Sequence, residues 1–127
     1  MKYILMMNAP KAGWEQFMQW PQEALKRHID FMHELNKKLT AAGELVSAEG
    51  LTPPSEAKVV RASHNGPVID GVFAETKEFL AGWWIIDTPT PERAYAVAAE
   101  ASAAPGPDGK PLGMPIEVRA IGVCPEV

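Results

Sequence analysis

Two stretches of this 127-residue chain hold side chains of the kinds that carry out acid–base chemistry. The first is an amphipathic segment that carries a histidine, His28, near the middle of its apolar side and an asparagine, Asn36, two turns further along. The second runs from Asp70 to Glu78, where three carboxylates and one ammonium group surround a glycine turn. Both stretches suggest a site for proton transfer or for binding a small polar ligand.

His28 has two interpretations. At 100° per residue it lies between Leu35 and Met32, so its imidazole turns toward the interior. It is either a neutral, hydrogen-bonded part of the core or an acid, base or ligand contact at the floor of a pocket. Asn36 shares that face, so the pair could form the polar end of a cleft, unless Asn36 only caps a backbone group. His33 falls toward the charged side.

The charged run also has two interpretations. Asp70 could be an Asx-turn residue, Gly71 a position with positive φ and Phe73 a plug in the core, with the other charges solvated. Alternatively, the charged side chains form the polar rim of a pocket. In that case the candidate residues are Asp70 as a catalytic partner of His28, and Arg61, Glu75, Lys77 and Glu78 as ligand contacts.

Trp83 and Trp84 occupy adjacent positions of the apolar run at residues 80–87. Successive strand residues point to opposite faces, so one indole should meet the helices and the other the opposite face of the sheet. Large aromatic residues in strands usually belong to the core, but Trp83 is also a candidate ligand contact.

The composition excludes several classes of protein. The net charge is −4 and no run of Lys or Arg is present, so direct nucleic-acid binding is not expected. The apolar stretch from Tyr3 to Met7 is too short for a signal peptide or a membrane span, which predicts a cytoplasmic protein. Cys124 is the single cysteine, so neither an intrachain disulfide nor a cysteine-rich zinc site can form.

Motifs that hold cofactors are also absent. The sequence lacks G-x-x-x-x-G-K-[ST], G-x-G-x-x-G, G-x-S-x-G and H-E-x-x-H. His28 and His33 are five residues apart and therefore do not form the i, i+4 pair of a helical metal site. We expect no cofactor and no metal.

Periodicity and turn residues define the elements. Helices are predicted at 21–42, with Gly43 as the C′ residue, and at 90–103, with Thr90 as the N-cap. The apolar face of the first helix should comprise Leu25, Ile29, Met32, Leu35 and Leu39. Strands are predicted at 2–8, 44–51, 57–63, 80–87 and 116–121, with a hairpin turn at 64–66 leading into 68–69 and a Pro- and Gly-rich loop at 104–115.

This order predicts one α+β domain over residues 1–127, with a ferredoxin-like antiparallel sheet and both helices on one face. The strands at 2–8 and 80–87 are apolar on both faces, although two helices can cover only one. An identical subunit packed on the other face would remove that surface from water, so we expect a homodimer.

The segment Asp70 to Asp87, DGVFAETKEFLAGWWIID, resembles the D-G-P-F-x-E-[TS]-K-E-x-[IL]-x-G-[FYW] core of the DGPF branch of the YciI-related (YCII) family. The matching residues are Asp70, Gly71, Phe73, Glu75, Lys77, Glu78 and Gly82, whereas Val72 replaces the usual proline. The resemblance extends over nearly the whole chain. It implies a ferredoxin-like fold that dimerises into an α+β barrel.

For function, the resemblance implies two different possibilities. In the YciI branch a histidine of the first helix and an aspartate late in that helix are proposed as a catalytic pair, and one relative is a dehydrochlorinase acting on a muconate-type acid. His28 matches that histidine, but residues 40–42 offer no aspartate, so Asp70 or Glu75 would have to supply the carboxylate. DGPF-type domains also occur near or fused to sigma factors.

Two hypotheses follow. The first is a dimeric protein that binds a small organic acid, as a lyase or isomerase, with His28 as acid or base and Lys77 or Arg61 as anion partner. The second is a non-catalytic regulatory or protein-interaction module linked to transcription. A cleft that holds His28 beside an ordered carboxylate would favour the first, and a filled core around His28 would favour the second.

Overall fold

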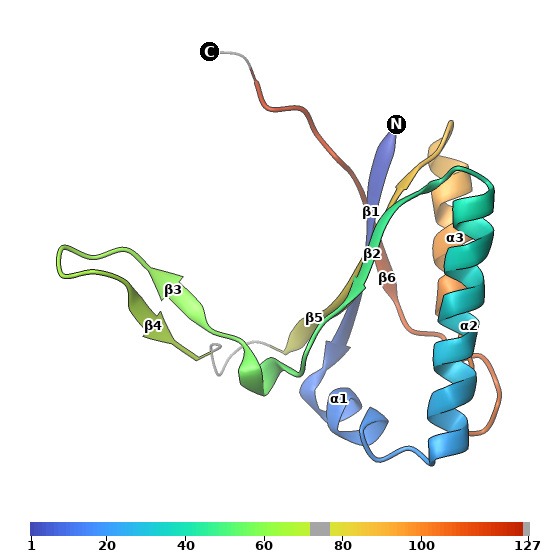
Figure 1. Ribbon diagram of the computed structural model, residues 1–127, viewed down its shortest axis with the longest axis horizontal. Helices are drawn as coiled ribbons and strands as arrows, with labels where there is room; N and C mark the ends of the chain where they lie inside the picture. Colours follow the sequence, from blue (N-terminus) through green and yellow to red (C-terminus); the bar gives the residue numbers. More distant parts are fainter. Residues whose placement is uncertain (72–76, 126–127) are drawn as a thin grey trace.

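A computed structural model describes residues 1–71 and 77–125 of the chain (Figure 1). Phe73 and Glu75 therefore lie outside the described residues. The strands of the main sheet are β1 (Lys2–Pro10), β2 (Leu45–Gly50), β5 (Glu78–Asp87) and β6 (Ile116–Ala120), and the long helices are α2 (Gln22–Ala41) and α3 (Pro91–Ser102). The other elements are α1 (Lys11–Phe17), the 3-10 turn η1 (Pro54–Glu56) and the hairpin strands β3 (Val59–Arg61) and β4 (Val68–Asp70).

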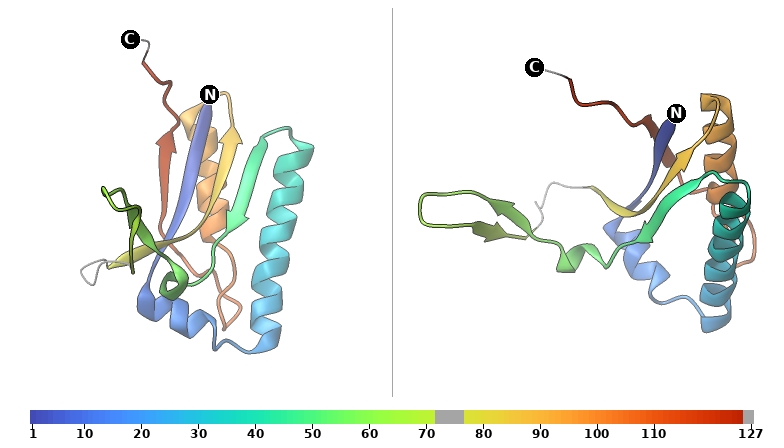
Figure 2. Two further views of the ribbon diagram at one scale, coloured as in Figure 1. Left: turned by 60° about the vertical axis from the view of Figure 1, so that its left-hand side comes forward. Right: turned by 45° about the horizontal axis from the view of Figure 1, so that its top comes forward.

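The main sheet has the order β2-β5-β1-β6, and each neighbouring pair is antiparallel. This is the strand order of a ferredoxin-like fold, because each long helix connects two strands with one other strand between them. Both α2 and α3 lie on the same face of the sheet (Figures 1 and 2). The α+β, ferredoxin-like prediction is confirmed.

The two long helices begin and end where the sequence predicts. Gly43 has φ +72°, and the Glu44 N–H donates to the Leu39 carbonyl at 2.9 Å, which closes α2 with a Schellman motif. Thr90 Oγ1 accepts the Arg93 N–H at 3.3 Å at the start of α3. Within residues 1–71 and 77–125, we find no helix with an apolar stretch long enough to cross a bilayer.

The buried face of α2 differs from the predicted one. Ala24, His28, Leu35 and Leu39 are buried, whereas Ile29, expected in the core, is 44% exposed. Leu35 and Leu39 belong to both the predicted and the observed set, so the two buried arcs overlap. The observed arc is rotated about the helix axis away from Ile29 and toward Ala24 and His28. Only the arc facing the sheet, α3 and the loop after α3 is enclosed, and Ile29 lies beyond it.

The core lies between the sheet and the two long helices. Residues of one parity along β1 and β5 point into it, which places Trp84 inside and Trp83 on the opposite face, as predicted. Small residues of α3 allow that helix to approach the sheet closely. The buried core cluster consists of Tyr3, Leu5, Leu35, Leu39, Trp84, Ile86, Ala94, Val97, Ala98 and Ala101.

The face of the sheet opposite the helices is apolar at its centre. The register pairs Ile4 with Ile85 and Met6 with Trp83 on this face, and these four side chains are only partly buried. We call this group the open-face patch. Figures 1 and 2 show that the described helices lie on the other side, and that the β3–β4 hairpin projects away from the body of the fold.

The hairpin turn lies where the sequence predicts it, whereas the prediction for Gly71 fails. Gly66 has φ +104° in the turn between β3 and β4. Gly71 does not have a positive φ, and a Cβ built on it meets nothing within 4 Å among the described residues. The prediction that Gly71 has a positive φ or a crowded surrounding is therefore wrong. Where the chain leaves β4, the backbone of Gly71 is not left-handed.

Candidate functional site

A cavity of about 290 Å³ lies between α2 and the β2–β5 side of the sheet. Its wall on the helix side carries the imidazoles of His28 and His33 and the amide of Asn36, and its opposite wall carries Trp84. The full lining is Met7, His28, Met32, His33, Asn36, Ala48, Glu49, Gly50, Gly82, Trp83 and Trp84. A mainly apolar hollow with a few convergent polar groups is the usual form of a small-ligand site.

His28 is the most enclosed polar group of this cavity, with 6% of its surface exposed. Its Nδ1 lies 3.0 Å from the carbonyl oxygen of Pro105. A carbonyl only accepts hydrogen bonds, so Nδ1 carries the proton and donates it. In the neutral ring the lone pair is then on Nε2, which is the nitrogen left to accept a proton.

The imidazole is held on its other sides by aromatic rings. The Phe17 and Trp20 ring centroids lie 5.4 and 5.6 Å from that of His28, and both contacts are edge-to-face. Both residues belong to α1 and the turn that follows it, which the sequence analysis left without an element. The residues between β1 and α2 therefore cover His28 and restrict its rotation.

The loop after α3 places the Pro105 carbonyl. The Leu112 N–H donates to the Ala104 carbonyl at 2.8 Å, and the Gly106 N–H donates to the Lys110 carbonyl at 2.8 Å. These bonds close the predicted Pro- and Gly-rich loop on itself. Because internal hydrogen bonds hold this loop in one conformation, the Pro105 carbonyl has a fixed position. It therefore sets both the orientation of His28 and its tautomer.

Asn36 lies two turns after His28 and lines the same cavity, as the helical spacing predicts. Its side-chain Oδ1 accepts a hydrogen bond from Trp84 Nε1 at 2.8 Å. The partner is thus an indole of the core and not a backbone group, which was the alternative. The bond ties the middle of α2 to the central strand β5 across the cavity wall.

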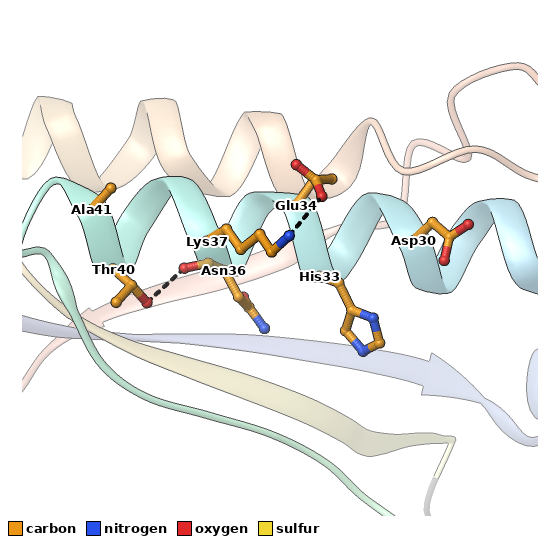
Figure 3. Close-up of a pocket in the computed structure, with 7 residues that line it drawn as sticks. All are labelled: Asp30, His33, Glu34, Asn36, Lys37, Thr40 and Ala41. Atoms are coloured by element: carbon orange, nitrogen blue, oxygen red, sulfur yellow. Dashed lines mark hydrogen bonds and ion pairs between the residues drawn. The ribbon is translucent and has the colours of Figure 1, made fainter.

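His33 was assigned to the charged side of α2, and it is indeed exposed. It nevertheless lines both this cavity and an open groove of about 850 Å³ along the outer side of the helix. Figure 3 shows the side chains of His33 and Asn36 pointing from α2 toward the strands. The signal that could have found His33 is its position three residues before Asn36, which puts the two on adjacent turns.

The outer groove is a weaker candidate. Its polar side chains contact groups of the same helix. Lys37 Nζ lies 3.5 Å from Glu34 Oε1, and Thr40 Oγ1 donates to the Asn36 backbone carbonyl at 2.8 Å (Figure 3). These are the contacts of an ordinary solvated helix surface.

The charged residues of the second stretch lie elsewhere. Asp70 Oδ2 accepts a hydrogen bond from Arg61 Nη2 at 2.9 Å across the β3–β4 hairpin, and both side chains are exposed. Lys77 and Glu78 are exposed at the start of β5, and none of these four residues lines the cavity. The monomer thus does not bring Asp70 to His28, while Glu75 is outside the described residues.

Trp83 borders the cavity, but its side chain belongs to the open-face patch, since its register partner is Met6. Glu49 is also in register with Trp83, so its carboxylate points to that same face. In the described part of the chain, no three His, Cys, Asp or Glu side chains come close enough to hold a metal ion.

The strongest electrostatic contact lies away from the cavity, between the start of β2 and α3. Arg93 donates from Nε and Nη2 to the two carboxylate oxygens of Glu44 at 2.9 and 2.8 Å. These hydrogen bonds hold the pKa of the Glu44 carboxyl below its ordinary value, against the opposing effect of burial, and they raise the pKa of the Arg93 guanidinium. The pair joins two secondary-structure elements and is structural in character.

The fold and the cavity together define a ferredoxin-like α+β protein with a histidine-bearing hollow under its first long helix. Residues 1–106 match the YCII-related domain, so the chain belongs to the YCII-related family. The chain is also similar to an uncharacterised protein of Rhizobium meliloti (strain 1021), with 30% identity over 107 residues that cover 84% of this chain and 86% of the relative.

Proposed function

We propose that the cavity under α2 binds a small organic acid and that His28 acts there as an acid or base, in a lyase or isomerase reaction. The observation that carries the proposal is the arrangement of His28. Its Nδ1 is engaged by the Pro105 carbonyl, and the ring, although packed against Phe17 and Trp20, still borders the cavity.

The proposed chemistry is proton abstraction from a carbon beside a carboxyl or carbonyl group. Nε2 takes the proton, the electrons of the broken C–H bond move into the ligand, and the imidazolium keeps its Nδ1–H bond to Pro105. In an isomerisation the proton returns to another carbon, and in an elimination a leaving group departs with the electron pair. A positioned general base typically contributes about 10²–10⁴-fold to such a rate.

The proposal also includes a homodimer formed through the open-face patch. Ile4, Met6, Trp83 and Ile85 are only partly covered by the described residues, although they form the centre of the sheet. The projecting hairpin supports the same idea, since Val60 and Ile69 are exposed on it and an isolated two-stranded hairpin is marginal in water. A second subunit would cover both.

The charged candidate residues of the second stretch have a role in this proposal only if the homodimer forms. Asp70 and Arg61 sit on the projecting hairpin, and Lys77 and Glu78 follow it. In the assembled protein they are proposed to form a charged rim, in keeping with the DGPF-like motif and with a place in that branch of the family. Asp70→Asn tests this role, because loss of turnover with unchanged folding would support it.

Solvent deuterium incorporation tests the proposed reaction without knowing the substrate. The protein is incubated in D₂O with a panel of four- to six-carbon carboxylic acids, and exchange at carbon is followed by NMR. The expected result is incorporation into at least one acid, lost at least about 100-fold in His28→Gln. His64→Gln, in the exposed hairpin turn, is the matched control and should retain the exchange.

The rival hypothesis, a non-catalytic regulatory module, makes the opposite prediction. No acid of the panel would then exchange, in the parent or in any variant. Binding of the acids without exchange would separate the two parts of the proposal: the ligand site would stand and the role of His28 as acid or base would fail.

A further inference from the structure

Asn36 and Trp84 form a pair whose hydrogen-bonding directions are set by chemistry. The indole Nε1–H can only donate, so the Asn36 atom 2.8 Å from it must be the oxygen Oδ1. This removes the usual ambiguity between the oxygen and nitrogen of an asparagine amide. The Nδ2 group, with two N–H donors, is then turned away from Trp84.

Within residues 1–71 and 77–125, the hydrogen bonds of Asn36 involve its Oδ1 and its backbone carbonyl, and Nδ2 is not a buried atom, so its N–H groups are open to solvent or a ligand. The backbone carbonyl of Asn36 accepts from Thr40 Oγ1, but this leaves the side-chain amide unaffected. The residue lies at the boundary between the enclosed cavity and the outer groove. Its nitrogen points toward the strands in Figure 3.

The cavity offers few other groups to recognise a ligand oxygen. Its described lining contains no Lys or Arg, and Glu49 directs its side chain to the opposite face of the sheet. His28 has its Nδ1–H engaged by Pro105, so in the neutral ring it can offer only an acceptor. Apart from the single N–H of the exposed His33 ring, Asn36 therefore supplies the side-chain amide donors for an oxygen.

We propose that Asn36, oriented by Trp84, is the residue that binds the carboxylate or carbonyl oxygen of the ligand. This inference rests on the proposed function and deepens it, because it assigns opposite roles to the two ends of the site. Nδ2 of Asn36 donates to the oxygen, and Nε2 of His28 meets the proton to be moved. The site selects a ligand that presents an acceptor to Asn36 and rejects one that presents only donors.

Three probes with the same four-carbon chain test this preference: butyrate, butyramide and butylamine. Butyrate presents only acceptors, butyramide has both kinds of group, and butylamine is a cationic donor. The measurement is a ¹H–¹⁵N NMR titration that follows the Asn36 side-chain NH₂ group and the Trp84 indole N–H. We expect butyrate to bind most tightly and to shift the Asn36 NH₂ resonances, with butylamine at least about tenfold weaker.

Asn36→Asp is the corresponding variant, since it keeps an oxygen for Trp84 and replaces both donors by a negative charge. Butyrate affinity should fall at least about tenfold while the Trp84 indole resonance stays in place, which a merely structural role would not produce. Glu34→Gln, in the outer groove, should leave butyrate affinity unchanged. The unmodified protein already gives the answer through the Asn36 NH₂ resonances if the variant fails to fold.

Two failures are distinguishable. If butyrate shifts the Met32 methyl and His28 ring resonances but leaves the Asn36 NH₂ group and the Asn36→Asp affinity unchanged, the role of Asn36 is overturned and the proposed ligand site stands. If none of the three probes shifts any resonance of the cavity, both the role of Asn36 and the proposed ligand site are overturned.

Discussion

The backbone carbonyl oxygen of Glu49 lies 2.8 Å from the position that a Cβ would occupy on Gly82. Gly82 is in register with Gly50 on β2, whose Cα is 3.4 Å from the same position. The edge strand can approach β5 this closely only because Gly82 carries no side chain, whereas a Cβ on Gly50 would meet nothing within 4 Å among the described residues. The two glycines thus shape one wall of the cavity that holds His28.

Gly82→Ala is therefore expected to destabilise the protein by about 1–3 kcal/mol, because the methyl group meets backbone atoms that can move only with the whole of β2. Chemical denaturation measures the change. Gly71→Ala is the matched control and should change the free energy of unfolding by less than about 0.5 kcal/mol, since no described residue lies within 4 Å of its Cβ position. Equal effects of the two substitutions would contradict the explanation.

Gly71 and Gly82 also show which role of a glycine can be predicted from the sequence and which cannot. Gly71 and Gly82 both belong to the DGPF-like motif. The sequence predicted a conformational role for Gly71, whereas in the structure Gly82 is the glycine that a side chain would force out of place. A turn glycine is suggested by its neighbours in sequence. The need for glycine at position 82 comes from a strand more than thirty residues away, which local patterns do not register.

The Glu44–Arg93 pair predicts a pH-dependent stability. The folded-state pKa of Glu44 is depressed by the Arg93 hydrogen bonds, so the pair contributes stability above the unfolded pKa of about 4.3 and loses it as the pH falls through the lower folded value. At neutral pH we expect Glu44→Gln to cost about 1 kcal/mol, a modest figure because the Arg93 side chain is 42% exposed and solvent screens the charge.

Urea denaturation at several pH values should show the difference between the parent and Glu44→Gln shrinking as the solution becomes acidic. Asp30→Asn is the control, because both side chains of the Lys26–Asp30 ion pair are exposed. This pair should contribute no more than about 0.5 kcal/mol to the free energy of unfolding. A Glu44→Gln cost that stays constant from neutral to strongly acidic pH would rule out the ionic origin.

The open-face patch predicts the oligomeric state. Light scattering at micromolar concentration should give twice the 13.8 kDa mass of the chain, and Trp83→Glu should shift the protein to the monomer by placing a charge in the interface. Tyr95→Glu, at an exposed position of α3, should remain dimeric. A parent protein that is monomeric under these conditions would refute the homodimer.

The sequence predicted most of the fold and part of the site. The strands of the main sheet, both long helices and the opposite orientations of Trp83 and Trp84 follow from local periodicity and turn residues. The short helix α1 lies in a stretch without clear periodicity. Its contact with His28 through Phe17 depends on how the chain turns between β1 and α2, which periodicity does not encode.

For the site, helical angles brought His28 and Asn36 together correctly, because both lie on one helix. The partners that give them their roles, Pro105 and Trp84, are 77 and 48 residues away in the chain. The charged run from Asp70 was one of two candidate sites because of its density of charge, yet its described residues lie on or beside a projecting hairpin. Density of charge alone does not tell whether residues line a cavity.

The most direct test of this account is the protonation pattern of the His28 ring, observed by long-range ¹H–¹⁵N NMR with and without butyrate. The account predicts that the neutral ring carries its proton on Nδ1, held by Pro105, and that the Nε2 resonance shifts when butyrate is added. His64, exposed in the hairpin turn, provides a reference in the same spectrum. A neutral ring protonated on Nε2, or an Nε2 resonance that no carboxylic acid moves, would contradict it.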